Sequence, residues 1–407
     1  MIEINPKESN LNGNIQLESS KSISNRMLII RALSQENFQI NNLSQADDTV
    51  ILDRLLNDYK NLEEIDCHHA GTTLRFLTSF LSIKNGEWTL KGSERMHQRP
   101  IAPLVESLKQ LGSNINYLEK SGYPPLRIKG QPINGDKIDI RGDISSQYIS
   151  SLLMIAPIMK NGLNLNIVSD ILSKPYIKMT LELMSNMGIE HTWDGASIVI
   201  KNQPYIGTSY SIENDWSGAS FWYSFAALAN SAEINLPFLY ESSVQGDSNV
   251  RYIYEKLGVS TYFHEKGITI KKSPQLLENP ISIDLKNYPD LGLPIAVTCA
   301  GLGLQTHLYG LESLKYKESD RLLMIKNELH KFNIESIVDS SSIVIKEGQK
   351  LEKPSSIIEC HDDHRIPMSI APLAMKIGKI KFNDKTVVNK SYPRFWNDLE
   401  RVQISCK

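Results

Sequence analysis

The sequence predicts an α/β protein of two domains, in which the helices are buried and the sheets lie outside. Two observations support this prediction: a helix–strand–turn–strand pattern recurs along the chain, and a second set of helical segments is apolar nearly all round. Helices without a polar face must be buried, and a recurring supersecondary unit indicates an internally repeated architecture. A chain of 407 residues is too long for one ordinary core and suits two domains of typical size.

The first kind of segment is an amphipathic helix that ends at Gly or Asn and is followed by two strands. The predicted helices that share this ending are Pro100–Leu111, Pro175–Met187, Asn249–Leu257 and Asp320–Phe332. Gly or Asn is expected just past a helix, because it adopts the left-handed conformation at little cost. In the last three, the interval from this residue to a Lys that ends the second strand is 13 residues (188 to 201, 258 to 271, 333 to 346). Two strands joined by a polar turn predict a hairpin.

The second kind of segment is apolar on nearly all sides and begins with small or charged residues. Its six members are Ser22–Leu33, Gly71–Leu81, Ser145–Ile158, Ser217–Ala229, Asp290–Leu304 and His364–Ile377. Together with the amphipathic helices they imply roughly six copies of a mixed α/β unit, three in each domain. We place the change of domain near Tyr210–Asp215 and a second crossing before Ser19. This gives an N-terminal domain of residues 19–213 and a C-terminal domain of residues 1–18 and 214–407.

The composition is that of a protein with a packed core and no overall charge bias. It is 41% hydrophobic and 22% charged, with a formal net charge of −2, so we expect no nucleic-acid partner and no membrane partner. The chain opens without the features of a signal peptide, and no apolar run reaches the ~18 residues that span a bilayer. We therefore expect a cytoplasmic protein. The cysteines Cys67, Cys299, Cys360 and Cys406 lack metal-ligand spacing, which predicts no metal site.

Polar groups gather at the starts of the six apolar helices. They are Lys21-Ser22, Ala70-Gly71-Thr72, Ser145-Ser146-Gln147, Asp215 with Ser217, Pro289-Asp290 and Asp363-His364-Arg365. Each start alone is typical of an ordinary helix cap, and we expect Ser22 or Ser24 to cap the first helix. In pseudo-symmetric repeats, however, these starts point the same way within each domain. Helix N-termini beside cations favour anions, so the pattern predicts a ligand that carries several phosphate or carboxylate groups.

Several motifs occur in an order and spacing that resemble one family over essentially the whole chain. They are Ser20-Lys-Ser-Ile-Ser-Asn-Arg26, His69-Ala-Gly-Thr-Thr-Leu-Arg75, Gln98-Arg-Pro-Ile101, Ser145-Ser-Gln147, Ser173-Lys-Pro-Tyr176, Lys317-Glu-Ser-Asp-Arg321 and Asp363-His-Arg365, followed by Lys390. Together they resemble the 5-enolpyruvylshikimate-3-phosphate (EPSP) synthases, the 3-phosphoshikimate 1-carboxyvinyltransferases of aromatic amino acid (chorismate) biosynthesis.

The resemblance implies a two-domain inside-out α/β barrel, with three βαβαββ units in each domain and a cleft between the domains. It implies transfer of the enolpyruvyl group of phosphoenolpyruvate to the 5-hydroxyl of shikimate-3-phosphate, with release of phosphate. These two small molecules are the implied partners, the first domain taking shikimate-3-phosphate and the second completing the phosphoenolpyruvate site. We expect a monomer without a cofactor, because Lys and Arg supply the charge neutralisation that a metal would otherwise provide.

Residue by residue, the resemblance implies three sets of functional side chains. The shikimate-3-phosphate set is Lys21, Ser22, Arg26, Ser145, Ser146, Ser173, Tyr176, Asp290, Ser313 and Lys317. The phosphoenolpyruvate set is Lys21, Gly71, Arg99, Gln147, Arg321, His364, Arg365 and Lys390. The catalytic set is Asp290, Lys317, Glu318 and Lys21.

The chemistry suggests how the catalytic residues divide the work. Asp290 is expected to be the base at the reacting hydroxyl, helped by Lys317. Either Glu318 or Lys390 would move the proton of the phosphoenolpyruvate methylene carbon, and the sequence leaves both open. Lys21 is expected to reach both ligands.

The sequence departs from the family pattern at four places. Ser19-Ser20 replaces a common Pro-Gly, His69 replaces Asn, Phe76 replaces Pro, and Ser313 stands where many members have Asn.

Two other functions are compatible with parts of this pattern. The first is a sister enzyme that acts on UDP-N-acetylglucosamine, which carries a loop Cys, whereas residues 92–124 contain none. The second is a catalytically silent phosphometabolite-binding protein, and the retained Asp290, Lys317 and Glu318 argue against it.

Overall fold

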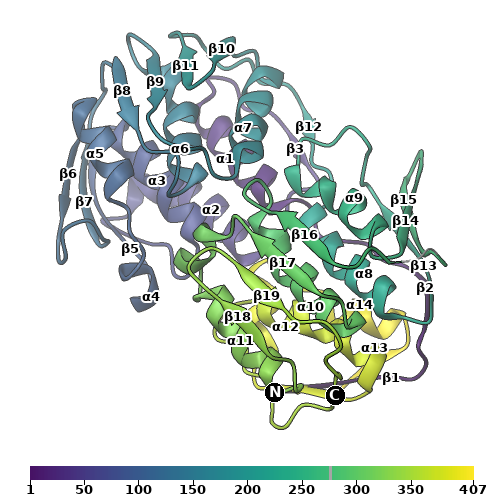
Figure 1. The fold of residues 1–407 in the computed structure, drawn as a ribbon. Helices are drawn as coiled ribbons and strands as arrows, with labels where there is room; N and C mark the ends of the chain where they lie inside the picture. The colour runs from purple at the N-terminus through teal and green to yellow at the C-terminus, as the bar shows by residue number, and fades with distance from the viewer. Residues whose placement is uncertain (275–276) are drawn as a thin grey trace. The chain divides into compact units, whose positions relative to one another are not determined.

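The computed structural model describes residues 1–274 and 277–407, which divide into two compact units (Figure 1). Unit 1 consists of Met1–Ser19 and Glu213–Lys407, and unit 2 consists of Ser20–Ile212. The N-terminal segment is part of unit 1 because its strands pair there. Strand β1 (Ile2–Pro6), purple in Figure 1, pairs with the yellow C-terminal strands β20 (Ile380–Phe382) and β21 (Ile404–Cys406).

Four sheets share one topology, in which a parallel pair is extended by an antiparallel hairpin. The two in unit 2 are β4 (Glu64–Asp66)-β5 (Gly86–Lys91)-β7 (Leu126–Gly130)-β6 (Asn114–Tyr117) and β8 (Lys137–Ile140)-β9 (Leu163–Ile167)-β11 (Ser197–Ile200)-β10 (His191–Asp194). The two in unit 1 are β2 (Asn10–Asn14)-β13 (Ser231–Pro237)-β15 (Gly267–Lys272)-β14 (Val259–His264) and β16 (Ile281–Asp284)-β17 (Thr306–Tyr309)-β19 (Ile343–Ile345)-β18 (Ser336–Val338). All four hairpins expected from the sequence are confirmed.

The third repeat of each unit is reduced. Among the described residues, its sheet is the three-stranded β20-β1-β21 in unit 1 and the parallel pair of β3 (Ile40–Asn41) with β12 (Tyr210–Ser211) in unit 2. Of the three units expected in each domain, two thus carry a four-stranded sheet and one carries a smaller sheet among the described residues. The sequence contains the reason, because the pattern of a helix, a Gly or Asn and a hairpin occurs four times.

The apolar helices are buried, as expected. They are α1 (Lys21–Leu33), α3 (Gly71–Ser82) and α6 (Ser146–Ile155) in unit 2, and α8 (Trp216–Leu228), α10 (Gly292–Leu302), α12 (Arg365–Ile370) and α13 (Ala374–Ile377) in unit 1. Every residue of α8 except Ser217 is buried. Hydroxyl groups inside these helices bond back to the preceding turn, as Thr78 does to the Leu74 carbonyl and Thr298 to the Pro294 carbonyl, both at 2.8 Å. Such bonds satisfy polar groups that would otherwise be costly to bury.

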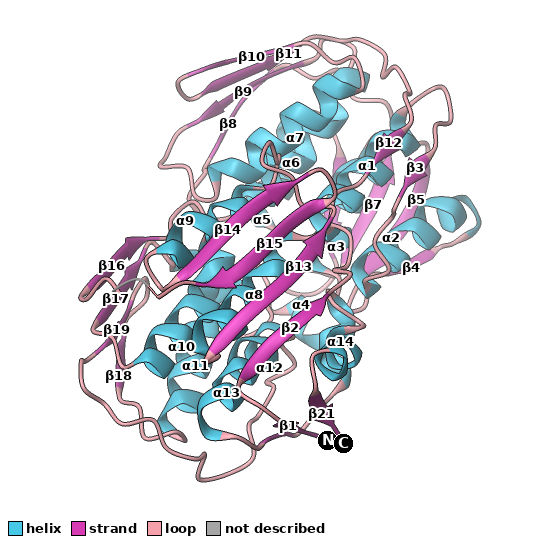
Figure 2. Cartoon of the chain, turned by 90° about the vertical axis from the view of Figure 1, so that its right-hand side faces the viewer, coloured by secondary structure: helices cyan, strands magenta, loops and turns pink. Residues whose placement is uncertain are grey.

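The sheets lie over these helices with one face toward solvent. Along β13 the residues from Ser231 to Leu236 alternate between exposed and buried, which is the pattern of a strand with one solvated face. Figure 2 shows β2, β13, β15 and β14 side by side with α8 behind them. The buried residues of α8 and of this sheet belong to one continuous hydrophobic core.

The remaining helices are shorter or amphipathic. They are α2 (Asp47–Asp58), α4 (Glu94–His97), α5 (Ala102–Gln110), α7 (Lys174–Asn186), α9 (Val250–Glu255), α11 (Arg321–His330) and α14 (Phe395–Arg401). The residues expected to end the amphipathic helices have positive φ angles: 97° at Gly112, 82° at Gly188, 79° at Gly258 and 63° at Asn333. None of the described helices has the length and apolar character needed to cross a membrane.

Candidate active site

The first predicted apolar helix, Ser22–Leu33, begins one residue earlier than expected, at Lys21. Ser20, and neither Ser22 nor Ser24, caps α1, because its side chain accepts the Ile23 N–H at 3.4 Å. Ser22 and Ser24 already have helical positions, and Ser24 instead accepts the Ser44 N–H at 3.1 Å. The expected cap was therefore wrong.

Lys21 is consequently the first residue of α1, at the positive end of the helix dipole. Its Nζ lies 3.2 Å from Oδ2 of Asp48, a carboxylate at the start of α2 with 4% side-chain exposure. Asp48 is a site neighbour that the sequence reasoning missed. The adjacent pair Asp47-Asp48 at a helix start was the available signal.

Arg26 is buried and bonded to its own unit. Its guanidinium donates to the Thr180 hydroxyl at 2.7 Å, to the Ser22 carbonyl at 2.8 Å and to the Ser150 hydroxyl at 3.2 Å. It also packs over the ring of Tyr176 at 5.8 Å. Burial lowers its pKa to about 10. These contacts join α1 to α6 and α7. Arg26 therefore holds Ser22 and Tyr176 in position, independently of any contact that it makes with a ligand.

The starts of α6 and α7 bring four predicted residues to helix N-termini. Ser145 caps α6 by accepting the Gln147 N–H at 3.3 Å, and the Gln147 side chain donates to the Thr72 hydroxyl at 3.0 Å. Ser146 begins the same helix and is buried. Ser173 precedes α7 with φ 55° and ψ 40°. This left-handed conformation is uncommon outside Gly and Asn, and such strain gathers at functional positions.

Gly71 and Arg99 lie in direct proximity. A Cβ atom added at Gly71 would lie 2.5 Å from Nη1 of Arg99 and 2.8 Å from Nη1 of Arg75. Arg75 donates to the Gly71 carbonyl at 3.0 Å, and Arg99 is buried with 7% exposure. The start of α3 thus holds two guanidinium groups in the space that a side chain at position 71 would fill.

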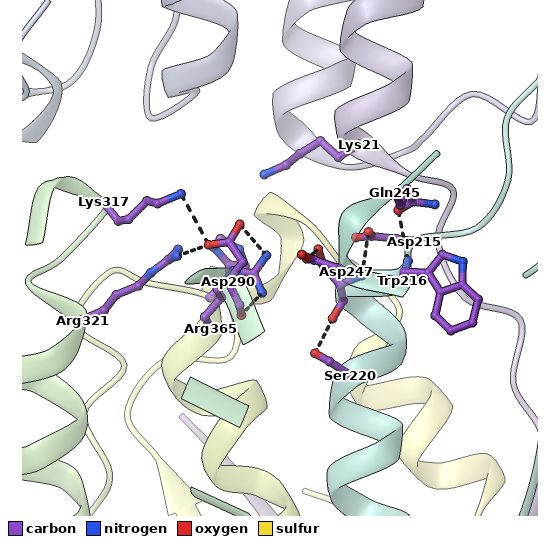
Figure 3. A network of polar contacts seen from close by, with 12 residues as sticks. Lys21, Asp215, Trp216, Ser220, Gln245, Asp247, Asp290, Lys317, Arg321 and Arg365 are labelled. Atoms are coloured by element: carbon purple, nitrogen blue, oxygen red, sulfur yellow. Dashed lines mark hydrogen bonds and ion pairs between the residues drawn. The ribbon is translucent and has the colours of Figure 1, made fainter. Parts of the chain in front are cut away.

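In unit 1, Asp290 is surrounded by three cations (Figure 3). It lies in a short 3-10 helix, Pro289–Leu291, directly before α10. Its Oδ1 is 2.9 Å from Arg321 Nη1 and 3.4 Å from Lys317 Nζ, and its Oδ2 is 3.2 Å from Arg365 Nη2. Arg365 also donates to the Asp290 carbonyl at 3.1 Å.

Arg321 joins Asp290 to two further carboxylates. Its Nε bonds to Asp363 Oδ2 at 2.8 Å and its Nη2 to Glu318 Oε2 at 2.7 Å. Glu318 Oε1 in turn lies 2.9 Å from Lys390 Nζ. The side chain of Arg321 is 2% exposed and that of Asp363 is 0% exposed. The structure therefore brings Asp290, Lys317, Glu318, Arg321, Arg365 and Lys390 into one charged cluster.

The cluster sets the ionisation of its members. Burial opposes the charge on Asp290, but Arg365, Lys317 and Arg321 together hold the pKa of its carboxyl well below its usual range. Burial also lowers the pKa of Lys317, against the attraction of Asp290. Burial opposes the charge on Arg321, yet Asp363, Glu318 and Asp290 raise its pKa. Asp290 is therefore held as a carboxylate, and Lys317 loses its proton at a lower pH than an ordinary lysine. A carboxylate and an amine of this kind can together exchange a proton.

His364 and Ser313 complete the predicted residues of unit 1. His364 directly precedes α12, is 2% exposed, and has its Nδ1 3.7 Å from Asp363 Oδ1. Ser313 lies in the 3-10 helix Glu312–Tyr316. Its Oγ is buried and has no hydrogen-bond partner among the described residues.

Asp363 is expected from the sequence only as part of a helix start, and no role for Asp247 is expected from it. Asp363 orients Arg321 through two bonds and accepts the Arg365 N–H at 3.0 Å. Its place directly before His364 and Arg365 was the available signal. No group of His, Cys, Asp or Glu able to hold a metal occurs in residues 1–274 and 277–407.

Comparison with known proteins identifies the relatives of the chain. The family model described as EPSP synthase (3-phosphoshikimate 1-carboxyvinyltransferase) matches residues 6–64 and 50–399. A 3-phosphoshikimate 1-carboxyvinyltransferase from Bacteroides fragilis (strain YCH46) is 42% identical over 401 residues, 98% of this chain and 97% of the relative. One from Colwellia psychrerythraea is 31% identical over 426 residues and covers 97% of each chain.

Solved structures share the fold. EPSP synthase from Acinetobacter baumannii matches with a TM-score of 0.80 at 20% identity, over 100% of this chain and 99% of that one. The enolpyruvyl transferase NikO from Streptomyces tendae matches with a TM-score of 0.77 at 14% identity, over 100% and 98%. These likenesses confirm the expected fold class, a two-domain inside-out α/β fold.

Proposed function

The chain belongs to the EPSP synthase family, and from this premise we propose how its own residues carry the family's reaction. That reaction transfers the enolpyruvyl group of phosphoenolpyruvate to the 5-hydroxyl of shikimate-3-phosphate and releases phosphate. Family membership favours this activity over the UDP-N-acetylglucosamine and silent-binding alternatives. We further propose that the protein acts in the cytoplasm as a monomer and needs no cofactor.

Shikimate-3-phosphate is assigned mainly to the helix starts of unit 2. We assign Lys21, Ser22, Arg26, Ser145, Ser146, Ser173 and Tyr176 to this ligand, with Asp290, Ser313 and Lys317 of unit 1. The positions of Ser22 and Ser146 support the assignment, because both lie in the first turn of a helix, where phosphate binds well. The strained backbone of Ser173 is a third supporting feature.

Phosphoenolpyruvate carries a carboxylate and a phosphate and therefore needs several fixed cations. We assign it Lys21, Gly71, Arg99 and Gln147 of unit 2, and Arg321, His364, Arg365 and Lys390 of unit 1. Arg residues suit this task because a guanidinium binds carboxylate and phosphate with two parallel bonds. The absence of a side chain at Gly71 supports the assignment, since it lets Arg99 occupy that space.

Asp290 and Lys317 are assigned to the reacting hydroxyl. In the free protein Asp290 is a weak base, because Arg365, Lys317 and Arg321 hold its pKa low. An anionic ligand that shares Arg365 and Arg321 would weaken their hold on Asp290 and make its carboxylate a better base for the hydroxyl proton. Lys317, with its own lowered pKa, is placed 3.4 Å from the same carboxylate to share or relay that proton.

The second proton transfer occurs at the methylene carbon of phosphoenolpyruvate. Protonation there makes C2 electrophilic, the 5-hydroxyl attacks C2, and loss of a methyl proton and of phosphate leaves the enolpyruvyl ether. Glu318 and Lys390, 2.9 Å apart, form the pair that we assign to this carbon. In this ion pair, the charge of each group stabilises the ionised form of the other. Both groups are candidates for the proton transfer itself.

The observation on which this proposal mainly rests is the convergence of Lys317, Arg321 and Arg365 on the single carboxylate of Asp290. The test is phosphate release with shikimate-3-phosphate and phosphoenolpyruvate, measured for wild type and for Asp290→Asn. We expect turnover in wild type and a loss of kcat of about 10²–10⁴-fold in the variant, the usual contribution of a general base. Phosphate release with UDP-N-acetylglucosamine and none with shikimate-3-phosphate would refute the assignment.

A further inference from the structure

Asp247 is a buried carboxylate that the proposed reaction does not use. It lies in the 3-10 helix Gly246–Asn249 of unit 1 and is 3% exposed. Its Oδ2 accepts a short hydrogen bond from the hydroxyl of Ser217, which stands in the first turn of α8. Its Oδ1 is also buried and has no hydrogen-bond partner in the described part of the chain. A carboxylate in this situation is costly to keep ionised.

The charged groups with the largest effects on Asp247 come from three elements. Asp215 caps α8, Asp290 and Tyr288 belong to the segment before α10, and Arg365 begins α12. Figure 3 shows Asp247 between Asp215 and the Asp290–Arg365 pair. Burial and the charge of Asp290 raise the pKa of Asp247 to about 6, although Ser217 and Arg365 favour its ionised form.

Arg365 is the one cation in this set of groups, and its guanidinium is already shared with Asp290 through bonds of 3.2 and 3.1 Å. An anionic ligand on Arg365 would add negative charge close to two carboxylates. Asp290 has two cationic partners besides Arg365, Lys317 at 3.4 Å and Arg321 at 2.9 Å, and its pKa lies well below its usual range, so it stays ionised when a ligand shares these cations. Asp247 has no second cation among these neighbours. An added anion therefore destabilises the ionised form of Asp247 more than that of Asp290.

We propose that Asp247 takes up a proton from solvent when phosphoenolpyruvate binds at Arg365, and that this uptake couples phosphoenolpyruvate affinity to pH. The inference rests on the proposed function, because it assumes that phosphoenolpyruvate engages Arg365. Asp247 acts here as a positioning residue and touches neither substrate. Its neutral form keeps the bond to Ser217 and removes one negative charge from the neighbourhood of Arg365.

The sign of the effect follows from linkage. If the bound state holds the proton more tightly, then the ligand must bind more weakly as pH rises above the pKa of Asp247 in the free protein. The weakening is up to tenfold per pH unit while the free form is ionised and the bound form is protonated. An Asn at position 247 is neutral at every pH and retains an oxygen for the Ser217 bond.

The main test compares the KM for phosphoenolpyruvate of Asp247→Asn and wild type between pH 5.5 and 8.5, at saturating shikimate-3-phosphate. The phosphate of the ligand also titrates in this range, but that contribution cancels in the ratio of the two KM values. We expect the ratio of variant to wild type to fall by three- to tenfold as pH rises from about 6 to 8. A ratio that does not change with pH, including a uniformly raised KM, would overturn the proposal.

Asp398→Asn is the matched control. Asp398 is a fully buried carboxylate of the same unit with a raised pKa and a hydroxyl partner, Tyr392 at 2.8 Å. The charges that act on it are those of Arg401, Arg394 and Glu18. Its KM ratio to wild type should therefore stay constant with pH. A decrease equal to that of Asp247→Asn would also refute the specific role of Asp247.

Thermal unfolding provides a readout that needs no activity. Because the folded-state pKa of Asp247 is raised, its ionisation costs stability as pH rises from its ordinary range toward about 6. Asp247→Asn should therefore raise Tm at pH 7.5 relative to wild type by more than it does at pH 4.5. If wild type fails to turn over the two substrates, the proposed function fails, while this Tm pattern still reports on Asp247. A Tm difference independent of pH would count against a titrating Asp247 in either case.

Discussion

The guanidinium group of Arg99 occupies the space that a side chain at Gly71 would need. The distance of 2.5 Å from an added Cβ atom to Nη1 of Arg99 is too short for any real contact, so one of the two groups must move. Arg99 is buried and its guanidinium is assigned to phosphoenolpyruvate. The same Cβ atom would lie 2.8 Å from Nη1 of Arg75, so a methyl group at position 71 displaces the Arg99 guanidinium and presses on that of Arg75 without removing either charge.

Gly71→Ala should raise the KM for phosphoenolpyruvate by roughly tenfold, equivalent to about 1.4 kcal/mol, with little change in the KM for shikimate-3-phosphate. The control is Gly218→Ala in α8, where the nearest atom to an added Cβ is 3.7 Å away. Steady-state kinetics with each substrate varied in turn measures both effects. Equal increases in the two KM values would show that the collision disturbs unit 2 as a whole.

Replacement of Arg321 should affect stability and activity together. Arg321→Lys keeps the charge, but a single ammonium group cannot reach Asp290, Glu318 and Asp363 in the fork geometry of a guanidinium. We expect kcat/KM to fall at least about 100-fold and the free energy of unfolding to fall by about 1–3 kcal/mol, because buried carboxylates lose a partner. Initial rates and denaturant unfolding provide the two measurements.

The control for this variant is Arg127→Lys, because Arg127 forms an exposed ion pair with Glu87. Exposed pairs contribute little to stability, so both measurements should stay near wild type. An Arg321→Lys protein with normal stability and normal kcat/KM would contradict the role of Arg321 as the centre of the cluster.

The alkaline limit of activity should report the ionisation of Lys317. Burial lowers its pKa from the ordinary value of 10.5, so the charged form that pairs with Asp290 is lost as pH rises through that lowered pKa. We expect kcat/KM for shikimate-3-phosphate to fall as pH is raised, and the midpoint of this fall to lie below pH 10.5. Lys317→Arg should be slower but should lose this decline, because Arg stays charged at all accessible pH values. An unchanged alkaline limb in the variant would assign the titration to another group.

The repeated architecture could be predicted from the sequence because its signals are local. A residue such as Gly188 or Asn333 ends a helix by its own backbone preference, and the hairpin follows within a few residues. The same locality explains the wrong cap of α1. Ser20, Ser22 and Ser24 have identical side chains, and only the path of the preceding backbone selects Ser20.

The long-range parts of the site could not be predicted in this way. The bond from Arg321 to Asp363 joins residues 42 positions apart in sequence, and the proximity of Gly71 to Arg99 depends on how a loop returns to the start of α3. Both residues of the second pair were named through the family resemblance, yet their contact was not. Asp247 carried no signal, because its surroundings come from helices that are distant in sequence.

The last prediction concerns Ser313, whose buried Oγ has no hydrogen-bond partner among the described residues. A buried hydroxyl without a partner is costly, so a ligand oxygen that accepts from it would gain that bond. Ser313→Ala should therefore raise the KM for shikimate-3-phosphate by about three- to tenfold, the value of one hydrogen bond, with kcat nearly unchanged. Ser336→Ala is the control, because the Ser336 Oγ is equally buried and unbonded but lies in strand β18. An unchanged KM in Ser313→Ala, or an equal rise in both variants, would remove Ser313 from the shikimate-3-phosphate site.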